Sequence, residues 1–366
     1  MSIKILVIGS TGKLGIKLLN FCHKNLIPIS GITCHKNNKL ILKQSSKFHI
    51  NNKFCLSDFA DYNLFINYIK FNKLDIIYFL DHGSNSLKIL SVILAHQRNC
   101  NIAIANKEMI IAGNNLMINK IKKSKNIFYP LDSEHFSLIN SKLNPSCDIS
   151  KIYITASGGP FYFKKNIDLK KVEKTQVLSH PKWKMGNNNL IDSSNFINKV
   201  LEIFELSIIY KIDIQKIDFL ISPAAFVHSV VIYNDYITCL NCFNNEMLIT
   251  LTYPLRKFYN FKLKSNIKKI NDHNNFYLEK YNDNRFKVFK YLNKLKKLNH
   301  SQQIKFMILN NLAQKLYLNN KLQYNDIFPY ILKNLHLNND KLELKSFSEI
   351  INYIELLNKK YESHQF

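Results

Sequence analysis

The stretch that decides the fold is Ile-Lys-Ile-Leu-Val-Ile-Gly-Ser-Thr-Gly-Lys-Leu-Gly, residues 3–15. Residues 3–8 are almost continuously apolar, which predicts a buried strand, and Leu14, Leu18 and Leu19 begin a helical pattern. The glycines between them, spaced GxxGxxG, let the backbone approach a pyrophosphate at the N-terminus of the helix. The stretch therefore predicts the first strand, turn and helix of a dinucleotide-binding domain.

Four more apolar segments continue this pattern along the chain. Strands are predicted at 27–34, 76–80, 102–105 and 127–129, with helical patterns between them. Such alternation is typical of an α/β fold with a Rossmann-like, doubly wound parallel sheet whose two faces are covered by helices. Ligands of these sheets bind at the carboxyl ends of the strands, so the residues after each strand are candidates for the site.

The residues after the second strand indicate which nicotinamide cofactor binds. The segment Cys34-His35-Lys36-Asn37 is basic and holds no acidic residue. NAD sites place Asp or Glu near this point to bind the ribose hydroxyls, whereas basic residues suit the 2′-phosphate of NADPH. We therefore expect NADPH. The alternative interpretation of His35 and Lys36 is a solvated loop in a Lys-rich protein.

Polar clusters close two further strands. Asn106-Lys107-Glu108 follows 102–105, and the segment 130–135, Pro-Leu-Asp-Ser-Glu-His, follows 127–129. Asp132 and Glu134 are close enough in sequence to share one hard, oxygen-liganded cation such as Mg²⁺ or Mn²⁺. The alternative is a helix N-cap with acids in the first turn.

The second half of the chain predicts two further domains. Residues 152–161 predict a strand that ends in a Gly-Gly turn, where Ser157 and backbone amides can hold a phosphate. Two strand-like pieces follow within 217–233, 256–300 predicts a linker with loops, and amphipathic patterns predict helices at 304–318 and 347–357. We expect an NADPH-binding domain over 1–131, a central α+β catalytic domain over 132–260, a linker over 261–300 and a small helical domain over 301–366.

The stretch 180–202 contains more side chains that can bind a ligand or take part in catalysis than any other. It predicts a loop that feeds a helix, because Ile197, Leu201, Phe204 and Ile208 recur at helical spacing, with Asp192 or Ser193 as the N-cap. A helix N-terminus with Ser193, Asn198 and Lys199 favours an anion, and Glu202 would sit deeper. Ahead of it, Trp183 and Met185 suit an apolar flap over a ligand. The alternative is an amphipathic surface helix.

Composition limits the function classes. The 366 residues contain no 18-residue apolar run, and no signal or transit peptide is evident at Met1, so we expect a cytoplasmic protein without a membrane partner. The net charge of +25 accompanies many Asn, Ile, Tyr and Phe, the products of A- and T-rich codons, which indicates a reduced bacterial genome rather than nucleic-acid binding. Seven cysteines in such a chain predict reduced thiols, and the single CxxC at 239–242 is a chance match.

Taken together and in order, these segments resemble one family, the 1-deoxy-D-xylulose 5-phosphate reductoisomerases of the non-mevalonate isoprenoid route. The matching pieces span roughly residues 1–235. They are Gly-Ser-Thr-Gly-Lys-Leu-Gly (9–15), Ala-Asn-Lys-Glu (105–108), Pro-Leu-Asp-Ser-Glu-His (130–135), Thr-Ala-Ser-Gly-Gly-Pro-Phe (155–161), His-Pro-Lys-Trp-Lys-Met-Gly (180–186), Asp-Ser (192–193) and Asn-Lys-Val-Leu-Glu (198–202).

The resemblance implies an NADP-dependent oxidoreductase that rearranges 1-deoxy-D-xylulose 5-phosphate and reduces the resulting aldehyde to 2-C-methyl-D-erythritol 4-phosphate. It implies a homodimer, a divalent metal (Mg²⁺ or Mn²⁺) and NADPH. By similarity the metal ligands would be Asp132, Glu134 and Glu202. The substrate would be held by Ser157, His180, Ser193, Asn198 and Lys199, with Lys107 and Ser133 also facing it and with Trp183 and Met185 as a closing lid. NADPH would contact Thr11, Gly12, Lys13, Leu14, Lys36, Asn37, Asn106, Glu108 and Gly186.

The chain departs from the family pattern at several positions. The family's Gly-x-x-Gly turn near the nicotinamide is not kept around His82-Gly83. The family's His-Pro-Gln-Ser segment is Ser-Pro-Ala-Ala at 222–225, and Val200 stands where the family has a Gly. A basic pair has become Asn187-Asn188, and the usual Asn-Glu motif is not evident near Asn310. Two alternatives to the family reaction remain: an NADPH-dependent dehydrogenase of a phosphorylated aldehyde without rearrangement, and a nucleic-acid-binding protein built on a decayed enzyme.

Overall fold

The computed structural model describes residues 3–139, 141, 148–180, 185–263, 277–335 and 342–362. The chain forms two compact units, each built from two separate segments. The first unit comprises Met1–Phe136 and Glu246–Ile267, and the second comprises Ser137–Asn245 and Lys268–Phe366. Among the helices of the described residues, none combines the length and the apolar character needed to cross a membrane.

A six-stranded, wholly parallel sheet forms the centre of the first unit, in the order β3-β2-β1-β4-β5-β6. The strands are β1 Ile5–Ile8, β2 Gly31–Cys34, β3 Asn52–Cys55, β4 Ile76–Phe79, β5 Asn101–Ile104 and β6 Ile127–Pro130. Strands β1, β2, β4 and β5 are buried along their whole length, as expected for a parallel sheet covered on both faces. The strand order reverses between β1 and β4, so a ligand crevice of this sheet is expected where those two strands end.

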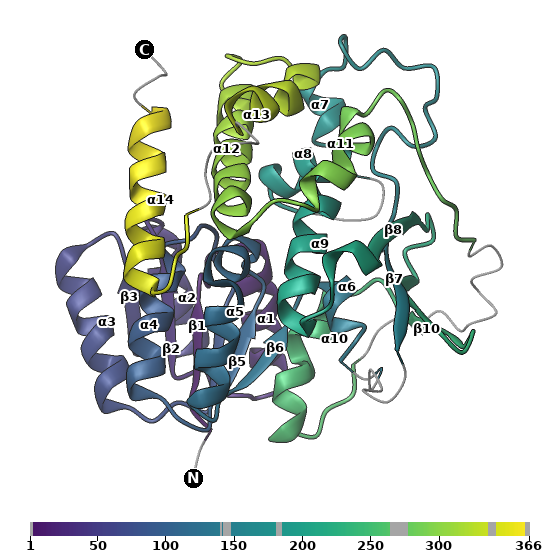
Figure 1. Ribbon diagram of the computed structural model, residues 1–366. Helices are drawn as coiled ribbons and strands as arrows, with labels where there is room; N and C mark the ends of the chain where they lie inside the picture. Colours follow the sequence, from purple (N-terminus) through teal and green to yellow (C-terminus); the bar gives the residue numbers. More distant parts are fainter. Residues whose placement is uncertain are drawn as a thin grey trace. The chain divides into compact units, whose positions relative to one another are not determined.

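Helices connect the strands of this sheet (Figure 1). They are α1 Lys13–Lys24, α2 Asn38–Phe48, α3 Phe59–Phe71, α4 Ser86–His96, α5 Lys107–Lys123 and the single turn α6 Ser133–Phe136. Helix α4 packs between α3 and α5, whereas α1 packs against α10 (Met247–Thr252), a helix of the returning segment. The connections therefore wind on both sides of the sheet.

The returning segment 246–267 completes the core of the first unit. Leu251 of α10 and Leu255 of the 3₁₀ turn η2 (Tyr253–Lys257) are fully buried in the same apolar cluster as Ile5 and Val7 of β1. The hydroxyl of the buried Tyr78 donates to the carbonyl oxygen of Leu251 at 2.8 Å. These contacts join segments more than 170 residues apart in sequence.

The second unit contains a four-stranded mixed sheet in the order β10-β9-β7-β8. Its strands are β7 Ile149–Ala156, β8 Ile217–Ile221, β9 Val227–Tyr233 and β10 Thr238–Cys242. Strands β7 and β8 are parallel, so Ala156 and Ile221 end side by side, while β9 runs antiparallel to both β7 and β10. Strand β10 lies at the edge of the sheet.

Helices make up most of the remainder of the second unit (Figure 1). They are α7 Lys174–Val177, α8 Asn187–Ser194, α9 Ile197–Tyr210, η1 Ile214–Lys216, α11 Lys287–Leu295, α12 His300–Leu318, η4 Tyr324–Asp326, α13 Ile327–Leu335 and α14 Phe347–Glu362. Helix α12 contacts both α13 and α14, which forms the predicted C-terminal helical part. Helix α9 packs on β8 and presents Ile197, Leu201, Phe204 and Ile208 to the core, as their spacing predicted.

The structure confirms the predicted fold class and corrects several local predictions. Strands β3 and β10 were not predicted, and helix α11 lies inside the predicted linker 261–300. The predicted N-cap of the 197–208 helix is wrong, since Asp192 and Ser193 lie within the separate helix α8 and α9 is preceded by Phe196. Phe196 has φ +65°, a left-handed conformation that turns the chain between two helices without a side-chain cap.

Candidate active site

The glycine-rich turn lies at the carboxyl end of β1. Gly9 has φ +82°, which favours glycine, and a Cβ on Gly15 would lie 2.5 Å from the Ser10 carbonyl oxygen. Gly12 precedes the first turn of α1 without a side-chain cap, and Ser10 N–H bonds the Thr33 carbonyl at 2.9 Å. The turn thus brings backbone amides of the α1 N-terminus to the crevice, a geometry suited to a pyrophosphate.

The other predicted cofactor residues of the first unit lie at strand ends and helix starts. Thr11, Lys13 and Leu14 form the turn and the first residues of α1. Lys36 is exposed after β2, and the Asn37 side chain caps α2 by accepting the Leu40 N–H at 3.1 Å. Lys36 is therefore the more accessible of this pair for a phosphate.

Asn106 caps the next helix and ties down the turn after β4. Its side-chain oxygen accepts the Met109 N–H at 2.9 Å, while its amide nitrogen donates to the Gly83 carbonyl at 2.9 Å and approaches Ser86 Oγ at 3.3 Å. Asn106 is buried, whereas Glu108 in the first turn of α5 is partly exposed. Asn106 therefore shapes the wall of the crevice through its hydrogen bonds.

Asp81 belongs to the same wall and was missed from the sequence. Its carboxylate accepts hydrogen bonds from Ser86 and from Asn106, and a Cβ on Gly9 would lie 2.6 Å from the Asp81 backbone nitrogen. Burial raises the pKa of the Asp81 carboxyl, and the bonds from Ser86 and Asn106 oppose that rise. Its position directly after the apolar run 76–80 was the available signal.

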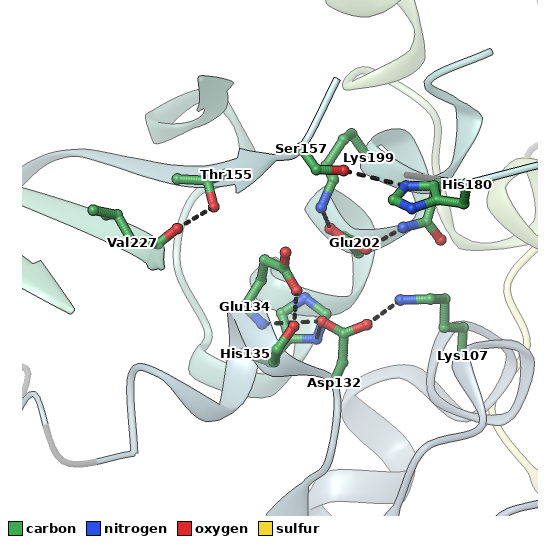
Figure 2. A network of polar contacts seen from close by, with 12 residues as sticks. Lys107, Asp132, Glu134, His135, Thr155, Ser157, His180, Lys199, Glu202 and Val227 are labelled. Atoms are coloured by element: carbon green, nitrogen blue, oxygen red, sulfur yellow. Dashed lines mark hydrogen bonds and ion pairs between the residues drawn. The ribbon is translucent and has the colours of Figure 1, made fainter. Parts of the chain in front are cut away.

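The first unit also supplies two carboxylates at the carboxyl end of β6. Asp132 and Glu134 each offer a carboxylate oxygen, and these atoms lie within 4.8 Å of each other. Asp132 forms an ion pair with Lys107 and accepts the Glu134 N–H at 3.2 Å, so it also begins the short helix α6 (Figure 2). Ser133 donates to Glu134. Both proposed roles, cap and ligand, are thus open to Asp132.

The second unit supplies a carboxylate on α9. Glu202 is 1% exposed and accepts hydrogen bonds from Asn198 and Lys199, one turn earlier on the same helix. The Lys199 side chain is itself 9% exposed, so the pair is almost wholly withdrawn from water. Helical spacing alone brings these three side chains to one face.

A serine and a histidine face each other at the end of β7. Ser157 Oγ lies 3.2 Å from His180 Nε2 (Figure 2). The pKa of His180 is lowered to about 4, first because burial disfavours the charged ring and second because of the Lys199 ammonium. His180 is therefore neutral at pH 7 and forms a hydrogen bond as an uncharged ring.

Helix α8 places Ser193 beside the Gly158-Gly159 turn. Gly159 has φ +66°, and a Cβ on it would lie 2.7 Å from the Ser193 carbonyl oxygen, so only glycine allows this approach. Gly186 precedes the first turn of α8, and Met185 is partly exposed beside it. Trp183 of the predicted lid lies outside the described residues.

The carboxylates within each unit are donors that suit a hard divalent cation. Each unit holds carboxylate oxygens, the ligands that Mg²⁺ and Mn²⁺ prefer. In each unit an ammonium contacts one of those carboxylates, Lys107 at Asp132 and Lys199 at Glu202. A carboxylate that already attracts a cationic group at close range is suited to bind a metal ion.

Comparison with known proteins points to one family. The family model of the 1-deoxy-D-xylulose 5-phosphate reductoisomerase C-terminal domain matches residues 128–210. The 1-deoxy-D-xylulose 5-phosphate reductoisomerase of Pelagibacter ubique is 35% identical over 362 residues, 90% of each chain. That of Thermoanaerobacter pseudethanolicus is 31% identical over 281 residues, 70% of this chain and 72% of the relative.

Solved structures share the fold. A DOX-P reductoisomerase in complex with NADPH, fosmidomycin and magnesium matches with a TM-score of 0.86 and 20% identity, covering 99% of this chain and 98% of that chain. The Zymomonas mobilis 1-deoxy-D-xylulose 5-phosphate reductoisomerase in complex with NADPH matches with a TM-score of 0.82 and 20% identity, covering 99% of both chains. The likeness of fold, together with the sequence identity to curated relatives along nearly the whole length, means that this chain belongs to the 1-deoxy-D-xylulose 5-phosphate reductoisomerase family.

Proposed function

We propose that the chain is an NADPH-dependent reductoisomerase that converts 1-deoxy-D-xylulose 5-phosphate to 2-C-methyl-D-erythritol 4-phosphate. The observation that carries the proposal is the membership of this family along 90% of the chain. It is supported by a turn suited to a dinucleotide at the end of β1 and by acidic groups after β6 and on α9.

Asp132, Glu134 and Glu202 would hold one divalent cation, Mg²⁺ or Mn²⁺. A cation there supplies Lewis-acid polarisation of the carbonyl and hydroxyl oxygens of the substrate. Lys107 and Lys199, which contact Asp132 and Glu202, would donate hydrogen bonds to substrate oxygens.

The phosphate of the substrate would lie between the end of β7 and the helices α8 and α9. Ser157 and Ser193 would donate hydroxyl hydrogen bonds, with Asn198 and Lys199 beside them. His180 would donate as a neutral ring, because its pKa is about 4. We call the residues Ser157, Ser193 and His180 the phosphate seat. Ser133 would face the substrate from α6.

NADPH would bind along the carboxyl ends of the first sheet. The pyrophosphate would contact Thr11, Gly12, Lys13 and Leu14, and the 2′-phosphate would contact Lys36 and Asn37. Asn106, Glu108 and Gly186 would line the nicotinamide end. Trp183 and Met185 would close over the ligands and exclude water while hydride moves.

An NADPH-consumption assay with 1-deoxy-D-xylulose 5-phosphate, with and without Mg²⁺ or Mn²⁺, tests the function. We expect oxidation of NADPH only when the metal is present, and a branched polyol phosphate as the product. An unbranched polyol phosphate would instead identify a dehydrogenase that does not rearrange its substrate. Absence of NADPH oxidation with either metal would contradict the proposal.

We also propose that the chain forms a homodimer through strand β10. This strand lies at the edge of its sheet, where Leu240 of the strand is 47% exposed and Ile237, the residue just before it, is 55% exposed. An exposed apolar edge strand favours pairing with a second copy. Light scattering should give twice the mass of the 42.9 kDa chain, and Leu240→Lys should shift it to the monomer.

A further inference from the structure

A buried carboxylate joins helix α8 to helix α12. Asp192 of α8 is 5% exposed, and both of its oxygens lie 3.0 Å from the amide nitrogen of Asn310. The amide nitrogen of Gln314 donates to the same carboxylate at 2.6 Å and to the Asn188 carbonyl at 3.3 Å. Asn310 and Gln314 are 1% and 0% exposed and lie one turn apart on α12.

The stability of α8 does not account for this arrangement. Asp192 lies in the last turn of an eight-residue helix, where the helix dipole disfavours negative charge. The side-chain oxygens of Asn310 and Gln314 are buried and have no hydrogen-bond partner among the described residues, which is unfavourable. With apolar side chains at these three positions the protein would be at least as stable. Stability therefore does not explain why the network is polar.

The network holds α8 in one position, and α8 is too short to be stable alone. Isolated helices of eight residues are unstable in water, whereas α12 has 19 residues and begins with a reciprocal capping box between Asn299 and Gln302. The carboxylate thus ties α8 to a long, well-anchored helix. On the other side, Gly159 lies against the Ser193 carbonyl, so α8 is held from both sides at the residue next to Asp192.

We propose that Asn310 and Gln314 are positioning residues that place Ser193 in the phosphate seat by holding the Asp192 carboxylate. This rests on the proposed function, because Ser193 is there a ligand of the substrate phosphate. It assigns a role in substrate recognition to the C-terminal helices, in which the sequence showed no chemistry. It also places Asp192 in a tertiary network in place of the predicted N-cap.

Binding of inorganic phosphate to the full chain, measured by titration calorimetry, tests the inference without depending on turnover. We expect Asn310→Leu to weaken phosphate binding about tenfold, and we expect a similar loss in Ser193→Ala. Asn311→Leu is the matched control, since Asn311 is the same residue type, the next along α12 and partly exposed, and it should bind phosphate like the wild type. Wild-type affinity in Asn310→Leu together with lost affinity in Ser193→Ala would overturn the inference.

A triple variant separates positioning from simple stabilisation. Asp192→Leu, Asn310→Leu and Gln314→Leu together replace the network by apolar groups, and the melting temperature should recover relative to Asn310→Leu alone. The phosphate affinity should stay low, because no hydrogen bonds orient α8. Recovery of both the melting temperature and the phosphate affinity would overturn the inference. A wild-type chain that binds phosphate but does not turn over the pentulose phosphate would contradict the proposed function alone.

Discussion

The two units hold their candidate residues in different physical settings. In the first unit, the candidate residues lie at the carboxyl ends of parallel strands, and the Asp132 side chain is 18% exposed beside Lys107. In the second unit, the corresponding ion pair of Lys199 and Glu202 lies on a helix, and the Glu202 side chain is only 2% exposed. The first half is shaped mainly by backbone turns, and the second by buried charged side chains.

This difference determines what each half tolerates. A partly exposed carboxylate can be solvated when it loses its partner, so changes there should mainly alter ligand binding. A buried carboxylate without its partner is strongly unfavourable, so changes on α9 should alter stability as well as chemistry. Variants at corresponding positions in the two units therefore test this difference.

The largest expected effect is that of Glu202→Gln. It removes a proposed metal ligand while keeping the hydrogen-bonding shape, so kcat should fall on the order of a thousandfold with the fold retained. Glu349→Gln is the control for the chemical change itself, since Glu349 is exposed on α14 and belongs to neither group of described side chains that could hold a metal ion. Metal-activation curves measure both variants. A kcat in Glu202→Gln as high as in Glu349→Gln would contradict the metal-ligand role of Glu202.

The next effect compares the two lysines in the absence of metal. Lys199→Met removes the cationic partner of the buried Glu202 carboxylate and should lower the free energy of unfolding by about 3 kcal/mol. Lys107→Met should lower it by about 1 kcal/mol or less, because Asp132 remains partly solvated. Urea unfolding gives both values, and added Mg²⁺ should reduce the Lys199→Met deficit. Equal losses of the free energy of unfolding in Lys199→Met and Lys107→Met would contradict the difference between the two units.

A smaller effect concerns the backbone turn of the first half. Gly15→Ala places a Cβ 2.5 Å from a carbonyl oxygen, so the turn must shift, and stability should fall by about 2 kcal/mol with a raised KM for NADPH. Ile16→Ala is the control, since Ile16 is the next residue of α1, is 37% exposed and is not a proposed cofactor contact. Kinetics with varied NADPH distinguish them, and an unchanged KM in Gly15→Ala would count against the turn as the pyrophosphate site.

A further expected effect is a pH dependence of stability in the second unit. The pKa of His180 is about 4 in the folded chain against an ordinary value of 6.5, so between these values the unfolded chain binds a proton that the folded chain does not. The free energy of unfolding should therefore rise between about pH 4 and pH 6.5. Above pH 6.5 the full contribution of the neutral His180 to this free energy is present. Urea unfolding across this range, compared with His180→Gln, should show a shallower slope in the variant. An identical slope would contradict the neutral histidine.

Local patterns predicted the first half of the site better than the second. Strand ends and the Gly9–Gly15 turn follow from apolar periodicity and glycine placement, both of which are readable within a few residues. Asp192 could not be placed this way, because its partners Asn310 and Gln314 lie more than 110 residues away. Strand β3 was missed because Asn52-Lys53 interrupts its apolar pattern, and β10 because every residue in it is at least partly exposed.

The return of the chain to the first unit has a consequence for biosynthesis. Leu251 and Leu255 complete the apolar cluster around β1, yet the ribosome makes them more than 110 residues after Phe136. At typical translation rates this interval lasts on the order of ten seconds. During that time the nascent nucleotide-binding sheet carries an uncovered apolar face, so a fragment ending near residue 136 should be aggregation-prone and a target for chaperones.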